Sequence, residues 1–300
     1  MTALSELSRE LTPPAQPVQS RAVVGNVRLH RAGRTLTYTL LTLAAIASLM
    51  PLYWMFTTSL KGQASYLKQP PEMFPANPTL ENFEQLFANP TMGRWILNSA
   101  IVSLSVTGLN IFFASLAGYT FAKLDFPGRR WLFWVYIATM MVPFQVTMFP
   151  LFKLMVSWGW VNTYWALIIP AAAWPYNVFL MRQVIQALPY EILDAGRIDG
   201  CSEFSLFWRV ALPMSTNGIA VMGIFTFIAS WNDFLWPLII LNSEKMRTLP
   251  IALATFQTTF ETNYGLLMAG GVIMAVPMFI MFFVFQRYFL QGVTFGALKG

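Results

Sequence analysis

The chain has 300 residues, of which 56% are hydrophobic and only 11% are charged, with a formal net charge of +6. This composition is too apolar and too poor in charge for an ordinary soluble domain, so we predict an integral membrane protein with an all-α fold. The positive charge does not indicate a nucleic-acid partner, because a basic cytoplasmic face beside anionic membrane lipid accounts for it.

Six intervals without charged residues are long enough to cross a bilayer, since a spanning helix needs roughly 20 apolar residues. They are residues 35–60, 95–122, 131–152, 154–181, 210–232 and 262–286. We therefore predict a polytopic protein with six transmembrane helices within 35–290. An N-terminal tail (1–34) precedes them and a C-terminal tail (291–300) follows. The N-terminal tail lacks the apolar run of a cleaved signal peptide, so the first helix should direct insertion.

The basic residues are unevenly divided between the two sides that six crossings define. One side holds 13 of the 19 Lys and Arg residues. The positive-inside rule makes this side cytoplasmic and predicts that both termini lie there. In the second interval, Ala114 and Gly118 form a small-xxx-small pair that favours close helix packing.

The segment between the fourth and fifth intervals carries much of the charge, in the run YEILDAGRIDGCSEFSLFWRVALP (190–213). Glu191, Asp194 and Arg197 recur every three residues, which predicts a helix with one charged stripe. Asp199 and Gly200 are typical of a turn after that helix.

A second short helix is predicted after this turn, because Ser202 is a favourable N-cap residue. Phe204, Phe207 and Trp208 lie at helical spacing and predict an apolar stripe that anchors the segment to the membrane helices. The charged first helix and the anchored second helix together favour a projection offered to a cytoplasmic partner. An amphipathic loop lying on lipid headgroups is the alternative.

The chain lacks the sequence motifs of the common catalytic and metal sites. Its one cysteine, Cys201, cannot form an intrachain disulfide, and its one histidine, His30, cannot build a metal site alone. The phosphate loop, the G-x-S-x-G elbow and the H-E-x-x-H motif are all missing. We predict that this subunit is not an enzyme and binds no cofactor itself.

Asp233 follows the fifth interval directly, and an acid at such a place usually faces protein or water. Trp231, Asn232 and Asp233 could line a sugar path, since acids and amides bond hydroxyl groups and aromatic rings stack on sugars. A structural hydrogen bond or a solvated helix end is the alternative for Asp233.

The segment 190–213 resembles the "EAA" loop of ABC-importer permeases. Residues at the positions of that pattern are Asp194, Ala195, Gly196, Gly200, Val210, Leu212 and Pro213. The chain departs from the pattern with Asp for Glu, Gly for Ala and Val for Ile. Four further segments are similar to the carbohydrate-importer branch, specifically its maltose-type second permease: QPPEMFPANPTLENF (69–83), FAKLDFPGRR (121–130), SWNDFLWPLIIL (230–241) and QRYFLQGVTFGALKG (286–300). The resemblance covers residues 30–300.

The resemblance implies a type I ABC importer permease fold in the cytoplasmic membrane of a bacterium or archaeon. An external solute-binding protein would deliver sugar to a heterodimer of two permeases. Two cytoplasmic ATPase subunits, which would bind ATP and Mg²⁺, would power the import.

Residues 183–213 would be the coupling loop that seats in a groove of an ATPase subunit. The residues implied in this contact are Glu191, Asp194, Ala195, Gly196, Asp199, Gly200, Leu212 and Pro213. In the C-terminal tail, Gly296 and Lys299 would reach the ATPase dimer interface.

An ion-coupled secondary transporter of a small polar solute is the alternative function. Such a transporter needs ligands for its coupling ion near the middle of the membrane. Apart from Asp233 the six spans contain no acid or base. This favours the ATP-driven importer.

Overall fold

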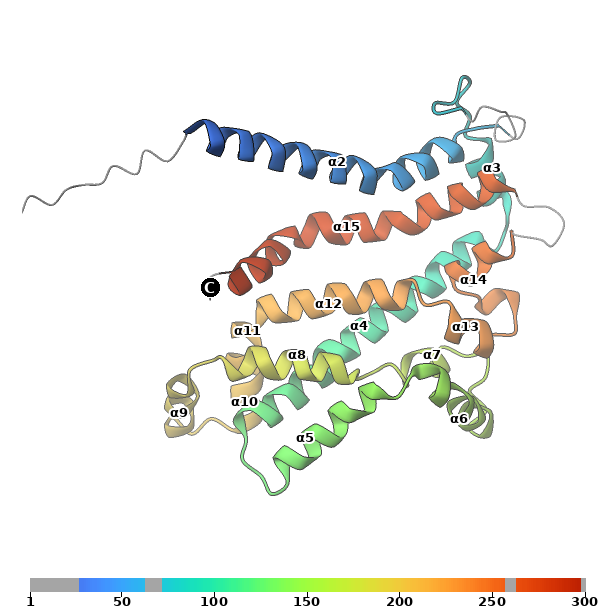
Figure 1. Ribbon diagram of the computed structural model, residues 1–300. Coiled ribbons are helices and arrows are strands. Elements are labelled where there is room, and N and C mark those ends of the chain that lie inside the picture. Colours follow the sequence, from blue (N-terminus) through green and yellow to red (C-terminus); the bar gives the residue numbers. More distant parts are fainter. Residues whose placement is uncertain (1–26, 63–71, 257–262, 298–300) are drawn as a thin grey trace, which may run out of the picture. The chain divides into compact units, whose positions relative to one another are not determined.

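The computed structural model describes residues 27–62, 72–256 and 263–297, and every regular element in these ranges is a helix (Figure 1). The chain divides into two compact units, Met1–Leu52 and Tyr53–Gly300. In the first unit, the described residues belong to α2 (Val27–Ser59), which continues into the second unit. The stretch Gly33–Ser59 of α2 is long and apolar enough to cross a membrane, as predicted for the first interval.

The centre of the second unit is α4 (Met92–Lys123). It packs against α8 (Pro175–Gln186) and α12 (Thr216–Trp231), and α15 (Tyr264–Ala297) packs against α12. In Figure 1, α4 and α15 run along most of the length of this unit, and the shorter α8 and α12 begin at the end near α9 and α10. The end with α9 (Tyr190–Ile198) and α10 (Glu203–Leu206) belongs to the coupling loop. The other end holds α3 (Glu81–Ala88), α6 (Phe144–Ser157), α7 (Trp165–Ile168), α13 (Leu235–Ile240) and α14 (Leu249–Ala254).

Many polar and small side chains face the interior along α4, together with Trp95 and Tyr119, whereas other large apolar side chains face outward. Asn98, Ser103 and Asn110 are fully buried, while Leu104 and Phe113 are exposed. The amide of Asn110 donates to the carbonyl oxygen of Ala171 (2.6 Å) and so connects α4 with the segment before α8. Lipid solvates apolar side chains and leaves polar ones to pair with each other, so this inverted pattern is the one expected of a membrane bundle.

Two of the predicted spans are sharply bent. The third interval contains α5 (Arg129–Ala138), the 3₁₀ turn η1 (Thr139–Met141) and α6, with a 99° bend between the 129–141 and 144–157 segments. Proline disfavours helical backbone in the residue before it, and Val142, which precedes Pro143, is extended. An 80° bend separates 203–214 from α12, with the break at Ser215.

The fourth interval (154–181) is also divided, among the end of α6, the single turn of α7 and the start of α8. Gly159 (φ 68°) and Asn162 (φ 62°) have left-handed backbone that a helix cannot contain, and Pro175 begins α8. Three helices in the described part are long and apolar enough to cross a membrane singly, or up to five spans exist if each bent pair counts as one.

The C-terminal boundary differs from the predicted one, because α15 continues as a helix to Ala297. The tail predicted to start at 291 is therefore helical over most of its length, including the backbone of Gly296. The glycines in this segment do not end the helix, because a helical backbone satisfies its own hydrogen bonds whichever side chain is present. Lys299 lies outside the described residues.

The small-xxx-small pair lies where α4 meets α8. A Cβ atom on Gly118 would come within 2.8 Å of the Met181 Cβ and 2.9 Å of the Arg182 backbone nitrogen. Ala114, one turn earlier, is fully buried. The close packing predicted from this pair is therefore confirmed, and Gly118 allows the backbones of α4 and α8 to approach each other.

We expect Gly118→Ala to destabilise the folded protein by about 1–3 kcal/mol, because overpacking against backbone atoms forces the helices apart. Gly108→Ala on the same helix is the matched control, since a Cβ there meets nothing within 4 Å. The control should keep or slightly raise the stability, as alanine favours helix. Thermal unfolding in detergent measures both variants, and equal unfolding temperatures would contradict a packing role for Gly118.

Candidate functional site

The candidate site is the coupling loop (183–213), whose first helix is α9. After α9 the backbone closes a Schellman turn, in which the amide of Cys201 donates to Gly196 O (3.0 Å) and that of Gly200 donates to Arg197 O (3.0 Å). Gly200 has φ 81°, the left-handed conformation that this turn requires. The turn predicted at Asp199 and Gly200 is confirmed.

The second part of the coupling loop consists of α10, a π-helical turn (Phe207–Ala211) and α11 (Leu212–Met214). The Ser202 hydroxyl accepts a hydrogen bond from the Ser205 amide (3.3 Å), which confirms Ser202 as the N-cap. Leu206, Phe207 and Ala211 are buried in the same core cluster as α4 and α8 side chains. This face holds the coupling loop to the helix bundle.

Of the three residues predicted as the anchoring stripe, one is enclosed by the helix bundle. Phe207 is fully buried, but Phe204 is 58% exposed and Trp208 is 51% exposed. Trp208 still contacts α4, because its ring packs on Phe112 with the ring centroids 6.4 Å apart. Phe204 and Trp208 each lie tilted against the Phe207 ring. The π turn begins at Phe207, so its i→i+5 bonding alters the angular spacing of Trp208 and later residues but not that of Phe204.

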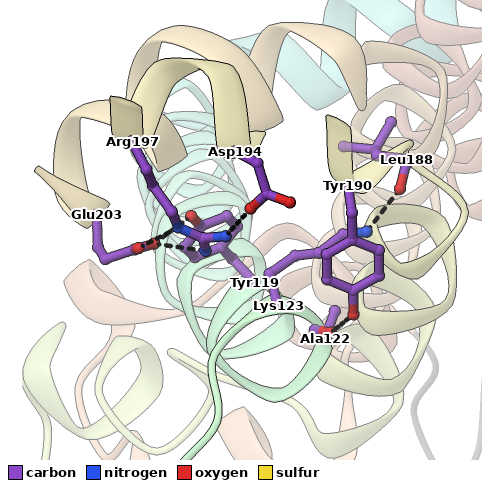
Figure 2. Close-up of polar contacts among 8 residues, drawn as sticks. All are labelled: Tyr119, Ala122, Lys123, Leu188, Tyr190, Asp194, Arg197 and Glu203. Atoms are coloured by element: carbon purple, nitrogen blue, oxygen red, sulfur yellow. Dashed lines mark hydrogen bonds and ion pairs between the residues drawn. The ribbon is translucent and has the colours of Figure 1, made fainter. Parts of the chain in front are cut away.

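A charged cluster joins the two helices of the coupling loop to each other and to α4 (Figure 2). Arg197 forms ion pairs with Asp194 (2.7 Å) and with Glu203 (2.7 Å). The Tyr119 hydroxyl of α4 donates to the same Glu203 carboxylate (2.7 Å). The hydrogen bonds that Arg197 donates to Glu203 and Asp194 raise the pKa of Arg197 above its ordinary value, and Arg197 lowers the pKa of Glu203. Arg197 and Glu203 are therefore both charged at neutral pH, and Glu203 loses its charge only when the pH falls below the ordinary range for glutamate.

A second contact fixes the start of α9 to the end of α4 (Figure 2). Lys123 is 4% exposed, and its ammonium donates to the carbonyl oxygen of Leu188 (2.6 Å). The same ammonium lies 3.7 Å from the centre of the Tyr190 ring, whose hydroxyl donates to Ala122 O (3.1 Å). Carbonyl oxygens and an aromatic face replace the water that this buried cation has lost.

Sequence reasoning missed these positioning residues: Tyr119, Lys123, Tyr190 and Glu203. Arg197 was predicted only as part of a charged stripe. Lys123 carried a usable signal, because it is the first charge after the uncharged interval 95–122. Tyr119 and Glu203 carried none, since they are 84 positions apart in the sequence.

The outward surface of the coupling loop combines acids with apolar groups. Glu191, Asp194, Ala195, Asp199 and Gly200 are exposed there, and Ile198 at the end of α9 is 87% exposed. Leu212 is partly buried and packs against the core cluster of α4 and α8 side chains, whereas Pro213 is exposed. Gly196 faces Leu206, since a Cβ on it would lie 2.5 Å from a Leu206 methyl carbon. It therefore serves packing inside the loop as well as the small surface predicted from the resemblance.

Asp233 and its neighbours lie toward the opposite end of the unit, where Asp233 lines a cavity of about 680 Å³. Trp231 is 2% exposed, stacks on Phe227 and donates to Met274 O (3.0 Å). Asn232 donates to Ile228 O (2.7 Å) and does not line the cavity. Of the three residues predicted to line a sugar path, Asp233 lines this cavity, whereas Trp231 and Asn232 form hydrogen bonds within the helix bundle. Among the described residues, no group of three His, Cys, Asp or Glu side chains could hold a metal ion.

An all-α membrane bundle with a rigidly attached coupling loop defines the permease subunit of an ABC importer. Residues 110–295 match the family described as "Binding-protein-dependent transport system inner membrane component", and the chain belongs to this family. The family and fold class predicted from the sequence are confirmed.

The chain is similar to proteins of the carbohydrate-uptake branch. It is 44% identical over 227 residues to the arabinooligosaccharides transport system permease protein AraQ of Halalkalibacterium halodurans, covering 75% of this chain and 81% of that protein. Identity to AraQ of Bacillus subtilis is 37% over 275 residues, covering 91% and 97%. A solved bacterial ABC transporter involved in the import of the acidic polysaccharide alginate has the same fold, with a TM-score of 0.79 and 20% identity over 91% of this chain and 100% of that chain.

Proposed function

We propose that this chain couples ATP hydrolysis by separate ATPase subunits to the import of an oligosaccharide. It would form a heterodimer with a second permease subunit in the cytoplasmic membrane of a bacterium or archaeon. A solute-binding protein would deliver the sugar at the end with α3, α13 and α14. ATP and Mg²⁺ would be bound by the ATPase subunits, and both termini of this chain would lie in the cytoplasm.

The observation that carries this proposal is the attachment of the coupling loop. The loop is joined to α4 by the Arg197–Glu203 pair, whose carboxylate accepts from Tyr119 of α4, and by the hydrogen bond from Lys123 to Leu188 O. A loop held in this way moves together with α4 and α8 when a partner pushes on it. It would thereby transmit closure of the ATPase dimer to the membrane helices.

The exposed surface of the coupling loop favours a protein partner over lipid headgroups. Glu191, Asp194 and Asp199 are exposed acids, and anionic lipid repels acidic groups. The exposed side chain of Ile198, next to Asp199 in the chain, offers an apolar contact on the same loop. Such a combination fits a groove with basic walls and an apolar floor. The similarity to arabinooligosaccharide permeases supports a short arabinose oligomer as the first sugar to test.

The test is uptake into proteoliposomes that contain this chain, the second permease and the ATPase subunits. The binding protein is supplied in one set of vesicles on the inside and in another set on the outside. We expect uptake of arabinotriose, maltotriose or raffinose only when ATP is supplied to the side of the coupling loop. The purified chain alone should hydrolyse no ATP. Uptake driven by a proton or sodium gradient without ATP would contradict the proposal and support the ion-coupled alternative.

A further inference from the structure

Asn110 of α4 is a fully buried polar side chain in the interior of the helix bundle. Its amide nitrogen donates to Val106 O of the same helix (3.0 Å) and to Ala171 O (2.6 Å). Its amide oxygen accepts from the Trp174 backbone N–H (2.9 Å) and from the Asn177 amide (2.8 Å). An asparagine side chain has two N–H donors and two acceptor lone pairs, so Asn110 uses all of its hydrogen-bonding capacity.

The backbone that Asn110 binds is the non-helical segment between α7 and α8 (169–174). Pro170 and Pro175 lack N–H groups, and Trp174 has extended backbone (φ −76°, ψ 135°). Such a segment cannot bond to itself as a helix does, and Asn110 supplies a donor for one of its carbonyl groups and an acceptor for one of its N–H groups. Ala171 and Trp174 also line the cavity of about 680 Å³. Asn110 therefore fixes part of the cavity wall to α4.

Two further polar residues extend this contact to the neighbouring helices. Asn177, in the first turn of α8, also donates to the Thr226 hydroxyl of α12 (2.9 Å), which donates to Met222 O (2.8 Å). Asn177 and Thr226 are both buried. Polar groups in an apolar interior have few alternative partners, so a fully bonded network strongly favours one arrangement.

The same helix carries the coupling loop at its other end. Tyr119 bonds Glu203 and Lys123 bonds Leu188 O, and α4 is one helix from Met92 to Lys123. A displacement of the coupling loop therefore reaches Asn110 through hydrogen-bonded helical backbone. A displacement of α8 alone would move only the end of the 169–174 segment that adjoins α8. Because Asn110 bonds the segment at two positions, α4 can move it as one piece.

We propose that Asn110 is a positioning residue for transport, which carries the displacement of α4 to the cavity wall at Ala171 and Trp174. Without this link, the ATPase would still close on the coupling loop, but the 169–174 segment would not follow α4. ATP would then be hydrolysed without import. This inference rests on the proposed function of ATP-driven sugar import.

The first experiment measures the ATP hydrolysed per sugar imported, in proteoliposomes that hold the complete importer. Asn110→Leu removes the link and keeps a side chain of similar size. The ratio of ATP hydrolysed to sugar imported should rise roughly three- to tenfold, since losing one hydrogen bond changes an equilibrium by about that factor. A loss of folded importer alone would lower hydrolysis and uptake together and leave this ratio unchanged.

Tyr136→Phe is the matched control, because the Tyr136 hydroxyl donates to Ala173 O of the same segment (2.9 Å) but belongs to α5. It removes one hydrogen bond from the segment and leaves the link to α4 intact, so its ratio should equal that of the wild type. Asn110→Ala is made alongside the leucine variant, because alanine preserves the helical backbone of α4. A ratio raised equally by Tyr136→Phe and by the Asn110 variants would overturn the inference, since any loosening of the segment would then suffice.

The second experiment follows the segment itself and begins with Asn110 intact. Ala171→Cys is combined with Cys201→Ser, and maleimide labelling of the importer in detergent is compared without nucleotide and after trapping the ATPase with ATP and vanadate. The labelling rate should differ between the two states, and Asn110→Leu should abolish this difference. Asn242→Cys is the control, because Asn242 is exposed and does not line the cavity, and its labelling should be equal in both states. Equal labelling of position 171 in both states with Asn110 intact would overturn the inference.

Failure of this inference and failure of the proposed function give different results. If the wild-type importer takes up sugar with ATP, but the Asn110 variants hydrolyse the wild-type amount of ATP per sugar, this inference is overturned and the proposed function stands. If the wild-type importer takes up none of arabinotriose, maltotriose and raffinose, the proposed function fails and this inference fails with it.

Discussion

Gly200→Val is expected to abolish most ATP-driven sugar uptake while leaving membrane insertion and permease pairing intact. Gly200 has φ 81°, and a Cβ on it would meet nothing within 4 Å. The cost of substitution therefore comes from the backbone alone. Left-handed backbone costs an ordinary residue about 1–2 kcal/mol, and a β-branched residue more, so the native turn should be populated at least about tenfold less. Without that turn, α10 leaves α9 in another direction and the Arg197–Glu203 pair cannot close.

Gly200→Asn is the matched control for this prediction, because asparagine tolerates left-handed backbone. It should retain most of the uptake although it adds a larger side chain than alanine would. Uptake in proteoliposomes and recovery of the ATPase with the tagged permease measure both variants. Equal activity of the valine and asparagine variants would show that the positive φ at this turn is not required for coupling.

The local features of the coupling loop could be predicted from the sequence because each depends on neighbouring residues. A glycine after Asp199 allows the Schellman turn, and a serine before Glu203 caps the next helix. Both are short-range hydrogen-bonding preferences that a local pattern expresses. The buried face after Phe207 could not be predicted, since a π turn leaves no distinct composition and shifts every later side chain.

The contacts that attach the loop to the bundle could not be predicted for a different reason. Tyr119 and Glu203 meet only because α4 and α10 pack side by side, and a single sequence does not record that packing. The same limit applies to Trp231, whose aromatic ring suggested a sugar contact but stacks on Phe227 inside the bundle.

The charge-free intervals predicted which parts of the chain are apolar. They did not predict where the helices in those parts bend. The intervals 131–152 and 154–181 have the composition of membrane helices. Pro143 and the left-handed residues Gly159 and Asn162 break them into shorter helices. Hydropathy is a sum over side chains, whereas a bend depends on one or two backbone angles. The cavity that Asp233 lines lies beside these breaks, on α6 and the 167–174 segment.

Arg197→Met is expected to lower sugar uptake roughly three- to tenfold and to weaken recovery of the ATPase with the permease. Methionine keeps the aliphatic part of the side chain, so the change removes the guanidinium with little loss of packing. The pair with Asp194 is exposed and contributes little by itself. The pair with Glu203 contributes more, because Glu203 is partly buried and also accepts from Tyr119.

Arg209→Met is the matched control, since Arg209 is an exposed basic residue of the same loop. Its sugar uptake and its recovery of the ATPase should equal those of the wild-type protein. This result would exclude a general effect of lost positive charge. Tyr119→Phe should produce a smaller loss than Arg197→Met. The double variant should lose less than the product of the two single effects, because both residues act on the one Glu203 carboxylate. Independent, multiplicative losses in the double variant would mean that Arg197 acts on the ATPase directly and that Glu203 does not position the loop.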